Sequence, residues 1–345
     1  FTGNDGRKAP CCSADNFHDG ETMIDVRAMM LEGKQPNICG SCYKNENHSK
    51  WSKRLSETTD WIAKFGEPNL DDPELQFIDL RFDATCNLKC KTCGPYNSTL
   101  WQKEKGIKIQ NQVDIKEKFS NIDKQKLKKV YMAGGEPTYI FAYKNFLEQL
   151  YSVNPNCEVI INTNLKSLPD AWKEIIKKFT NLTVICSCDA IDTLGEYVRY
   201  PLDWKKFEDN VKFASENANF FQFNLVASNL TAHRLYDTCN WMKKYSNNIF
   251  LSVLDRPEIF SEKAIPPEVR QKYIESVQNT RKIKVSSDCV VQFRSAINLM
   301  VKNLNSNEYS QKLQEKLKAE ITEQDSHRKT KLEDVDNFLQ GWIFS

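Results

Sequence analysis

The sequence lacks long apolar runs, a secretory signal and an excess of either charge. No stretch reaches the roughly 20 apolar residues that a transmembrane helix needs, and the first residues do not have the pattern of a signal peptide. The 48 basic and 46 acidic residues give a formal charge of +2, so no strong field favours long nucleic acid or a membrane surface. The four histidines show no metal-ligand spacing with one another. These features predict a cytoplasmic protein without a membrane or long nucleic-acid partner.

Cysteine, in contrast, is abundant, with 12 residues in a chain of 345. Disulfides are one interpretation of such a count. Clustered C-x2-C spacings without a signal peptide instead favour metal ligation in a reducing compartment. The chain is long enough for one large domain with a smaller one beside it, and its 40% hydrophobic residues suffice for a core.

From about residue 75 onward, short β-type runs alternate with amphipathic helical stretches, which predicts a parallel sheet with right-handed crossovers. The predicted strands are Ile78–Phe82, Lys129–Met132, Glu158–Asn162, Leu182–Cys188, Phe220–Val226 and Ile249–Leu254. The predicted helices are Tyr143–Val153, Pro169–Phe179, Trp204–Glu216, Ala232–Tyr245 and one that starts at Pro266. A partial (β/α)6 TIM-like barrel and an open doubly wound sheet both fit this α/β pattern, and both place chemistry at the C-terminal strand ends.

Three regions differ in composition. Residues 1–74 are polar, turn-rich and contain four cysteines, which predicts a small cysteine-rich module. We expect the barrel to occupy residues 75–300. Residues 301–345 form a predicted helical C-terminal tail, whose Lys and Glu content is typical of a solvated helix face and whose terminal apolar residues are expected to dock on the main domain.

The run CNLKCKTC places Cys86, Cys90 and Cys93 in a loop after the first predicted strand. A zinc site and a redox pair are possible interpretations of this C-x3-C-x2-C spacing. Fe–S clusters normally take four thiolates, so a three-thiolate loop would leave one iron of a [4Fe–4S] cluster open to another ligand. The loop position, between a strand and a helix, favours the cluster.

Further polar groups follow the next strands. Gly134-Gly135-Glu136-Pro137 ends the second strand, where glycines let the backbone approach a ligand closely, although an ordinary turn would have the same sequence. The other candidate binding residues at strand ends or shortly after them are Asn162, Asn164, Ser187, Asp189, Arg199 and Val226. The guanidinium of Arg199 could pair with a carboxylate.

The three-cysteine loop followed by the Gly-Gly-Glu turn resembles the radical S-adenosylmethionine (SAM) superfamily, over roughly residues 75 to 254. The resemblance implies that SAM binds the open iron of a [4Fe–4S] cluster held by the three cysteines, and that the polar strand ends and Arg199 bind SAM. It also implies reductive cleavage of SAM to a 5′-deoxyadenosyl radical that abstracts a hydrogen atom, and a flavodoxin- or ferredoxin-like electron donor.

A second cysteine set, Cys11, Cys12, Cys39 and Cys42, lies near the N-terminus. A zinc ribbon is one interpretation. The segment also resembles the SPASM and twitch modules of radical SAM proteins, which carry auxiliary iron–sulfur clusters, although in better-known members that module follows the barrel. Because adjacent cysteines rarely both reach one metal, we expect one of Cys11 and Cys12 to bind. The chain opens on Phe1 rather than Met, so residues upstream could supply a fourth ligand, with Cys289 a poorer candidate.

The leading hypothesis is therefore a radical SAM enzyme that modifies a peptide or protein side chain. A second hypothesis is the same chemistry on a small molecule or nucleotide. A third, from a different class, is a non-enzymatic binding protein stabilised by two metal sites. The sequence does not identify the substrate.

Overall fold

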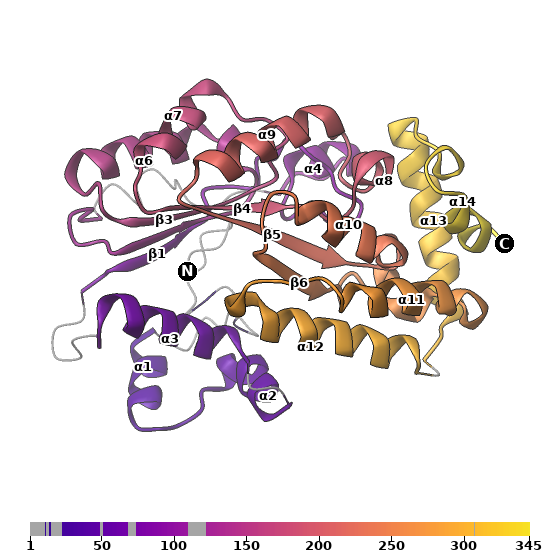
Figure 1. The fold of residues 1–345 in the computed structure, drawn as a ribbon, viewed down its shortest axis with the longest axis horizontal. Helices are drawn as coiled ribbons and strands as arrows, with labels where there is room; N and C mark the ends of the chain where they lie inside the picture. Colours follow the sequence, from indigo (N-terminus) through magenta and orange to yellow (C-terminus); the bar gives the residue numbers. More distant parts are fainter. Residues whose placement is uncertain are drawn as a thin grey trace.

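In the computed structural model, the central element is a sheet of six parallel strands whose order in the sheet is their order in the chain (Figure 1). The structure describes residues 11, 14, 23–48, 51–67, 74–109, 122–306 and 308–345. The strands are β1 (Phe77–Leu80), β2 (Lys129–Met132), β3 (Glu158–Thr163), β4 (Leu182–Ser187), β5 (Phe220–Ala227) and β6 (Ile249–Val253). A doubly wound sheet reverses its strand order at a switch point. The unbroken order confirms the α/β partial barrel instead.

The predicted strands and helices are confirmed with small shifts at their ends. The helices that follow the strands are α4 (Thr99–Lys105), α6 (Phe141–Val153), α7 (Asp170–Lys178), α8 (Asp192–Val198), α9 (Trp204–Asn217), α10 (Leu235–Met242), α11 (Arg270–Thr280) and α12 (Ser287–Leu304). The extension of the first strand to Phe82 was wrong, because the Phe82 N–H donates to the Tyr143 hydroxyl (3.0 Å) instead of a neighbouring strand. Short 3-10 turns, Ala232–Arg234 and Pro267–Val269, precede α10 and α11.

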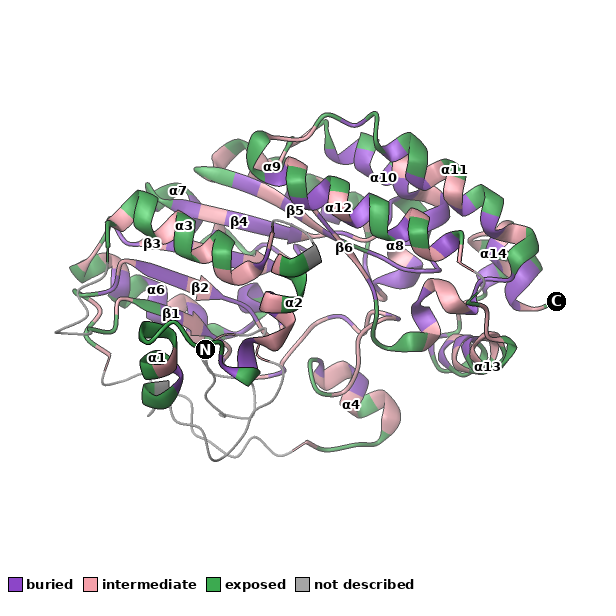
Figure 2. Ribbon diagram, turned by 90° about the horizontal axis from the view of Figure 1, so that it is seen from below, coloured by how far each residue is buried: buried purple, intermediate pink, exposed green. Residues whose placement is uncertain are grey.

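The two faces of the sheet differ in polarity. One face is covered by α6, α7 and α9 (Figure 1), and its side chains, such as Val159, Val184 and Phe223, are fully buried (Figure 2). Side chains on the opposite, inner face alternate with these and are partly exposed, including Asn162 and Asn224. The inside of the barrel is therefore polar and accessible, unlike the packed apolar interior of a complete barrel.

Helix α12 covers the free edge of β6. The side-chain amide of Gln292 donates to the Leu251 carbonyl and accepts from the Leu251 N–H. An exposed strand edge otherwise offers unpaired backbone groups to other chains. This pairing ends the sheet at β6.

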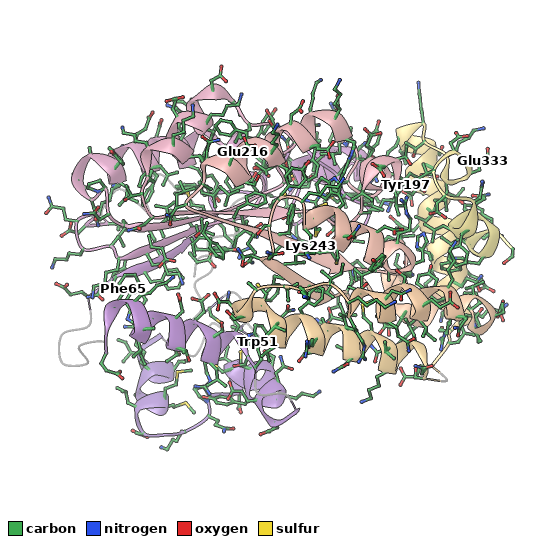
Figure 3. The ribbon with its side chains drawn as sticks, in the orientation of Figure 1. Trp51, Phe65, Tyr197, Glu216, Lys243 and Glu333 are labelled. Carbon is green, nitrogen blue, oxygen red and sulfur yellow. The ribbon has the colours of Figure 1, made fainter. Side chains whose placement is uncertain are left out.

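The N-terminal helices α1 (Met23–Leu31), α2 (Gly40–His48) and α3 (Lys53–Phe65) lie beneath the sheet (Figure 1). A 3-10 turn, Asn37–Cys39, precedes α2. Ser52 is the N-cap of α3, and its hydroxyl accepts a hydrogen bond from the Leu55 N–H. It attaches to the inner face at its two ends, marked by the labels of Trp51 and Phe65 in Figure 3: Trp51 contacts Phe250 of β6, and Lys64 pairs with Glu158 of β3.

The C-terminal region contains α13 (Gln311–Arg328), a 3-10 turn (Leu332–Asp334) and α14 (Asn337–Ile343). Leu339, Trp342 and Ile343 are buried, which confirms that the terminal apolar residues dock on the main domain. The expected solvated face of α13 is wrong in part, since Gln324 and Arg328 are buried beside Leu317 and Ile321. Within the described residues, no helix has the length and hydropathy needed to span a bilayer.

Candidate active site

The three-cysteine loop connects β1 to α4 and is held along its length by backbone hydrogen bonds. The Lys89 N–H donates to the Tyr200 carbonyl and the Lys91 N–H to the Val198 carbonyl, both at 2.7 Å. This strand-like pairing with the end of α8 fixes alternate residues of the loop. The backbone on both sides of Cys90 is therefore held in place.

Cys86, Cys90 and Cys93 lie close enough for their thiols to influence one another. Burial, reinforced by the neighbouring Cys90 thiol, raises the pKa of Cys86 and of Cys93 to about 12 each. Burial also raises the pKa of Cys90, although the Arg199 guanidinium opposes the shift. The Asn164 side-chain amide donates to the Cys86 sulfur at 3.8 Å. Such buried thiols need a positively charged metal partner to be held as thiolates.

Three cysteines of one loop are a donor set typical of an iron–sulfur cluster. Among the described residues, no three His, Cys, Asp or Glu side chains converge closely enough to hold one metal ion. In a [4Fe–4S] cluster each cysteine binds a different iron, so its sulfurs stand further apart than ligands around one ion. Cys86, Cys90 and Cys93 could each bind one iron and leave the fourth iron to another ligand.

The Gly134-Gly135 turn at the end of β2 packs directly on the cysteine loop. Both glycines have positive φ angles, 84° and 55°. A Cβ atom added to Gly135 would lie 2.2 Å from the carbonyl oxygen of Thr85, next to the first cysteine. The Glu136 N–H donates to the same oxygen at 2.8 Å. Glycine is therefore required here for a close approach between two backbones.

The Glu136 carboxylate is buried and hydrogen-bonded within the protein. One oxygen accepts from the Thr138 N–H (3.0 Å) and hydroxyl (2.7 Å) and from the Thr163 hydroxyl, and the other accepts from the Asn164 N–H (2.7 Å). Burial raises the pKa of Glu136, although these hydrogen bonds oppose the shift. The carboxylate thus ties the end of β2 to the end of β3.

Asn164 and Lys166, just after β3, reach the cysteine loop. The Asn164 amide donates to the Asn87 side-chain oxygen (2.8 Å), and the Lys166 ammonium donates to the Asn87 carbonyl (2.9 Å). Burial lowers the pKa of Lys166, while the thiols of Cys86 and Cys90 favour its charged form. Sequence reasoning missed Lys166, because a lysine after a strand carries no signal of its own.

Asp189 and Arg199 form a buried pair beside the cysteines. The Arg199 Nη1 donates to Asp189 Oδ2 at 2.6 Å, and Asp189 Oδ1 accepts from the Val226 N–H at 3.1 Å. The Arg199 Nε is buried without a hydrogen-bond partner. A buried donor without a hydrogen bond costs free energy. Because the Arg199 guanidinium lies near Cys90, this donor suits an anionic ligand there.

The side chains of Asn162 and Ser187 contact each other on the inner face of the sheet. The Ser187 hydroxyl donates to the Asn162 side-chain oxygen at 3.1 Å, and the Asn162 amide donates to the Tyr131 hydroxyl at 3.0 Å. Tyr131 was not predicted from the sequence. The structure therefore groups the predicted residues into three sets at the C-terminal strand ends: a glycine turn, an Asp–Arg pair and this polar row.

The N-terminal cysteine set is only partly described. Cys39, at the end of the 3-10 turn, and Cys42, in α2, are buried. Burial raises the pKa of Tyr43, and the neighbouring thiols of Cys39 and Cys42 raise it further. Cys11 is described and Cys12 lies outside the described residues. Cys289 lies at the start of α12 and near Ile249, the first residue of β6, at the opposite end of the strands from Cys86.

The radical SAM superfamily model matches residues 82–242, which run from the cysteine loop through α10. This match assigns residues 82–242 to the radical SAM superfamily. The superfamily's [4Fe–4S] cluster and SAM are accordingly implied for the site described above. The comparison with curated proteins gave no match.

Several solved structures are similar to the chain. Native anSMEcpe with bound AdoMet is 18% identical, with a TM-score of 0.46 over 61% of this chain and 60% of that one. SuiB of Streptococcus suis bound to S-adenosylmethionine is 16% identical, with a TM-score of 0.45 over 76% and 61%. TYW1 with a lysine–pyruvate adduct is 12% identical, with a TM-score of 0.42 over 74% and 82%. The chain therefore spans about 60% of the length of the first two, and a likeness at this level does not bear on substrate.

Proposed function

We propose that Cys86, Cys90 and Cys93 hold a [4Fe–4S] cluster at which SAM is cleaved reductively. The observation that carries this proposal is the packing of the cysteine loop on the Gly134-Gly135 turn, with the unpartnered Arg199 Nε beside Cys90. When bound, the cluster and SAM together supply the 5′-deoxyadenosyl radical that abstracts a hydrogen atom from substrate.

We expect different residues of the chain to bind different groups of SAM. Arg199 would donate from Nε to the SAM carboxylate, a charge-assisted hydrogen bond. Backbone carbonyls of the Gly134-Gly135 turn would accept from the SAM amino group. Asn162 and Ser187 supply hydroxyl and amide groups at the rim for the ribose hydroxyls. Glu136, hydrogen-bonded within the protein, positions this turn.

The test is formation of 5′-deoxyadenosine. The protein is reconstituted anaerobically with iron and sulfide, then given dithionite and SAM. We expect 5′-deoxyadenosine from the wild type and none from the variant in which all three cysteines are replaced by Ala. No product from a wild type with a fully loaded cluster would refute the proposal.

The proposed substrate is a peptide or protein side chain. Beyond the residues proposed for SAM, the inner face offers neutral donors and acceptors on β5, Gln222 and Asn224. Such groups can pair with the amides of an extended backbone. The formal charge of +2 supplies no field for a long nucleic acid.

A small-molecule or nucleotide substrate is the second candidate. A hollow of about 660 Å³ opens between α3 and the N-terminal halves of β3 to β5, at the opposite end of the strands from the cysteine loop, so it does not itself favour this candidate. Its lining includes Lys64, Glu158, Thr183 and Gln222. Incubation with SAM that carries no label and with deuterated peptide or metabolite pools distinguishes the candidates, since deuterium enters 5′-deoxyadenosine only from the true substrate.

For the N-terminal set we propose an auxiliary iron–sulfur cluster bound by Cys39, Cys42 and one of Cys11 and Cys12, with zinc as the alternative. Metal analysis of the reconstituted protein decides between them. About eight irons per chain support two [4Fe–4S] clusters, whereas about four irons and one zinc support a ribbon. We also propose a flavodoxin- or ferredoxin-like electron donor, tested by replacing dithionite with such a protein.

A further inference from the structure

Lys91, which directly follows the second cysteine, has a side chain that is inaccessible to solvent, and its charge is paired with a distant part of the chain. Its ammonium donates to Asp325 of α13 at 2.8 Å, and the exposed fraction of its side chain is 0%. The ammonium also lies 3.8 Å from the centre of the Tyr197 ring, a cation–π contact. The Lys91 backbone is fixed as well, through Val198.

Asp325 is held by more than Lys91. Its second oxygen accepts from the Tyr197 hydroxyl at 3.0 Å and from the Leu332 N–H at 3.1 Å, and the first also accepts from the Thr330 hydroxyl at 2.8 Å. Tyr197, labelled in Figure 3, lies on the side of the molecule where α13 packs. The carboxylate therefore joins the C-terminal segment, α8 and the cysteine loop at one point.

A second buried ion pair joins Arg328 of the same helix to Glu104 of α4 and leads to Cys90. Arg328 donates to both oxygens of Glu104, at 2.9 to 3.3 Å, and the side chains are 0% and 3% exposed. The Arg328 guanidinium lies over the Trp101 ring at 4.7 Å, and the indole N–H of Trp101 donates to the Cys90 carbonyl at 2.9 Å. One turn of α13 thus contacts the cysteine loop through two separate routes.

These contacts are more specific than docking of a tail requires. Burial of an ammonium is costly unless it is paired, and removal of one partner leaves the other charge uncompensated. Apolar residues would dock α13 at lower cost. Lys91 and Trp101 instead bring the pairs to the backbone that carries Cys90 and Cys93.

We propose that Asp325 and Arg328 are positioning residues that hold the cysteine loop in the geometry for its cluster, an inference that rests on the proposed function. They act through Lys91 and Trp101 and touch neither substrate nor cofactor. Supporting groups around metal ligands typically change metal affinity or activity about 10- to 100-fold when they are removed. The C-terminal helix is therefore part of the active site's support.

The experiment compares D325N with E323Q. Glu323 lies on the same helix and pairs with Lys105 of α4 at 2.8 Å, but its side chain is 47% exposed, so E323Q breaks a surface ion pair of α13 that does not involve the cysteine loop. Hydrogen exchange of the loop peptide is measured on the full chain without cluster. The electron paramagnetic resonance spectrum is then measured on the reconstituted, reduced protein.

We expect at least tenfold faster exchange of the loop amides in D325N, an altered resonance spectrum of the reduced cluster, and 5′-deoxyadenosine formation slowed about 10- to 100-fold. E323Q should match the wild type in all three. If D325N fails to fold, Y197F and the double variant K91M/D325N replace it, because neither leaves a buried charge without its partner, and both should show the same changes in smaller degree.

Wild-type exchange and an unchanged spectrum in D325N, or in both replacements, would overturn the inference. A wild type that forms no 5′-deoxyadenosine would instead refute the proposed function. The exchange measurement needs no cluster, so it still decides whether α13 holds the loop.

Discussion

Replacement of Gly135 by Ala tests the contact between the glycine turn and the cysteine loop. The new Cβ would lie 2.2 Å from the Thr85 carbonyl oxygen and 3.0 Å from that of Asp83, both backbone atoms that no side-chain rotation can move. Gly135 also has a φ angle of +55°, where a side chain is strained. The turn and the loop must therefore move apart.

The expected loss of stability follows from three effects. A left-handed residue with a Cβ costs about 1–2 kcal/mol, and the lost Glu136-to-Thr85 hydrogen bond about 0.5–1.5 kcal/mol. Overpacking adds about 1–3 kcal/mol, so the free energy of unfolding should fall by about 3–6 kcal/mol. At roughly 2–4 °C per kcal/mol, Tm should fall by about 6–24 °C.

The assay is thermal unfolding followed by circular dichroism, with iron content after reconstitution as a second measurement. Gly94→Ala is the matched control, since Gly94 follows the last cysteine of the same loop and an added Cβ there meets nothing within 4 Å. G94A should stay within about 2 °C of the wild type. Equal Tm and equal iron content in G135A and the wild type would refute the close approach.

Three further predictions concern other buried groups. Glu136→Ala should lower the free energy of unfolding by at least about 2–3 kcal/mol in a denaturant titration, because it leaves buried donors unpaired; an unchanged midpoint would contradict the tie between β2 and β3. Arg199→Met should weaken SAM binding at least tenfold by equilibrium dialysis, with Arg281→Met as the surface control; equal affinities would exclude Arg199 as the carboxylate partner. Burial lowers the pKa of His233, although its bond to Asp336 opposes the shift. The unfolded chain therefore binds the proton more readily, and Tm should fall as the pH drops below about 6.5; the same fall in His233→Gln would show that another group is responsible.

Local pattern was enough to predict most of the fold and the position of the site. The strands alternate apolar and polar residues, so their existence follows from the two-residue period. Parallel strands with chemistry at their C-terminal ends then place the cysteine loop, the glycine turn and Arg199 at one rim. These elements lie close together in the structure, and the binding roles of their residues stay predictions.

The parts that sequence reasoning missed depend on contacts between distant segments. The hydrogen bonds from Thr163 and Asn164 to Glu136 could not be foreseen, because they require the ends of β2 and β3 to lie side by side, while the predicted role of Glu136 in SAM binding stays a prediction. The charges of α13 were expected to face solvent, since nothing near Asp325 in the sequence indicates Lys91, 234 residues away. A charged residue on a helix is usually solvated, and only the tertiary structure identifies the exception. The domain limits at residues 74 and 300 stay predictions.

Direct contact between SAM and the cluster is the central claim, and hyperfine spectroscopy measures it. The reduced, reconstituted protein is mixed with SAM that carries ¹⁵N in its amino group, and its electron–nuclear double resonance spectrum is compared with that of unlabelled SAM. We expect a ¹⁵N coupling in the wild type that is lost in Arg199→Met at the same subsaturating SAM concentration. Identical spectra with labelled and unlabelled SAM, from a protein with a full cluster, would contradict the assignment of this loop as the SAM-binding site.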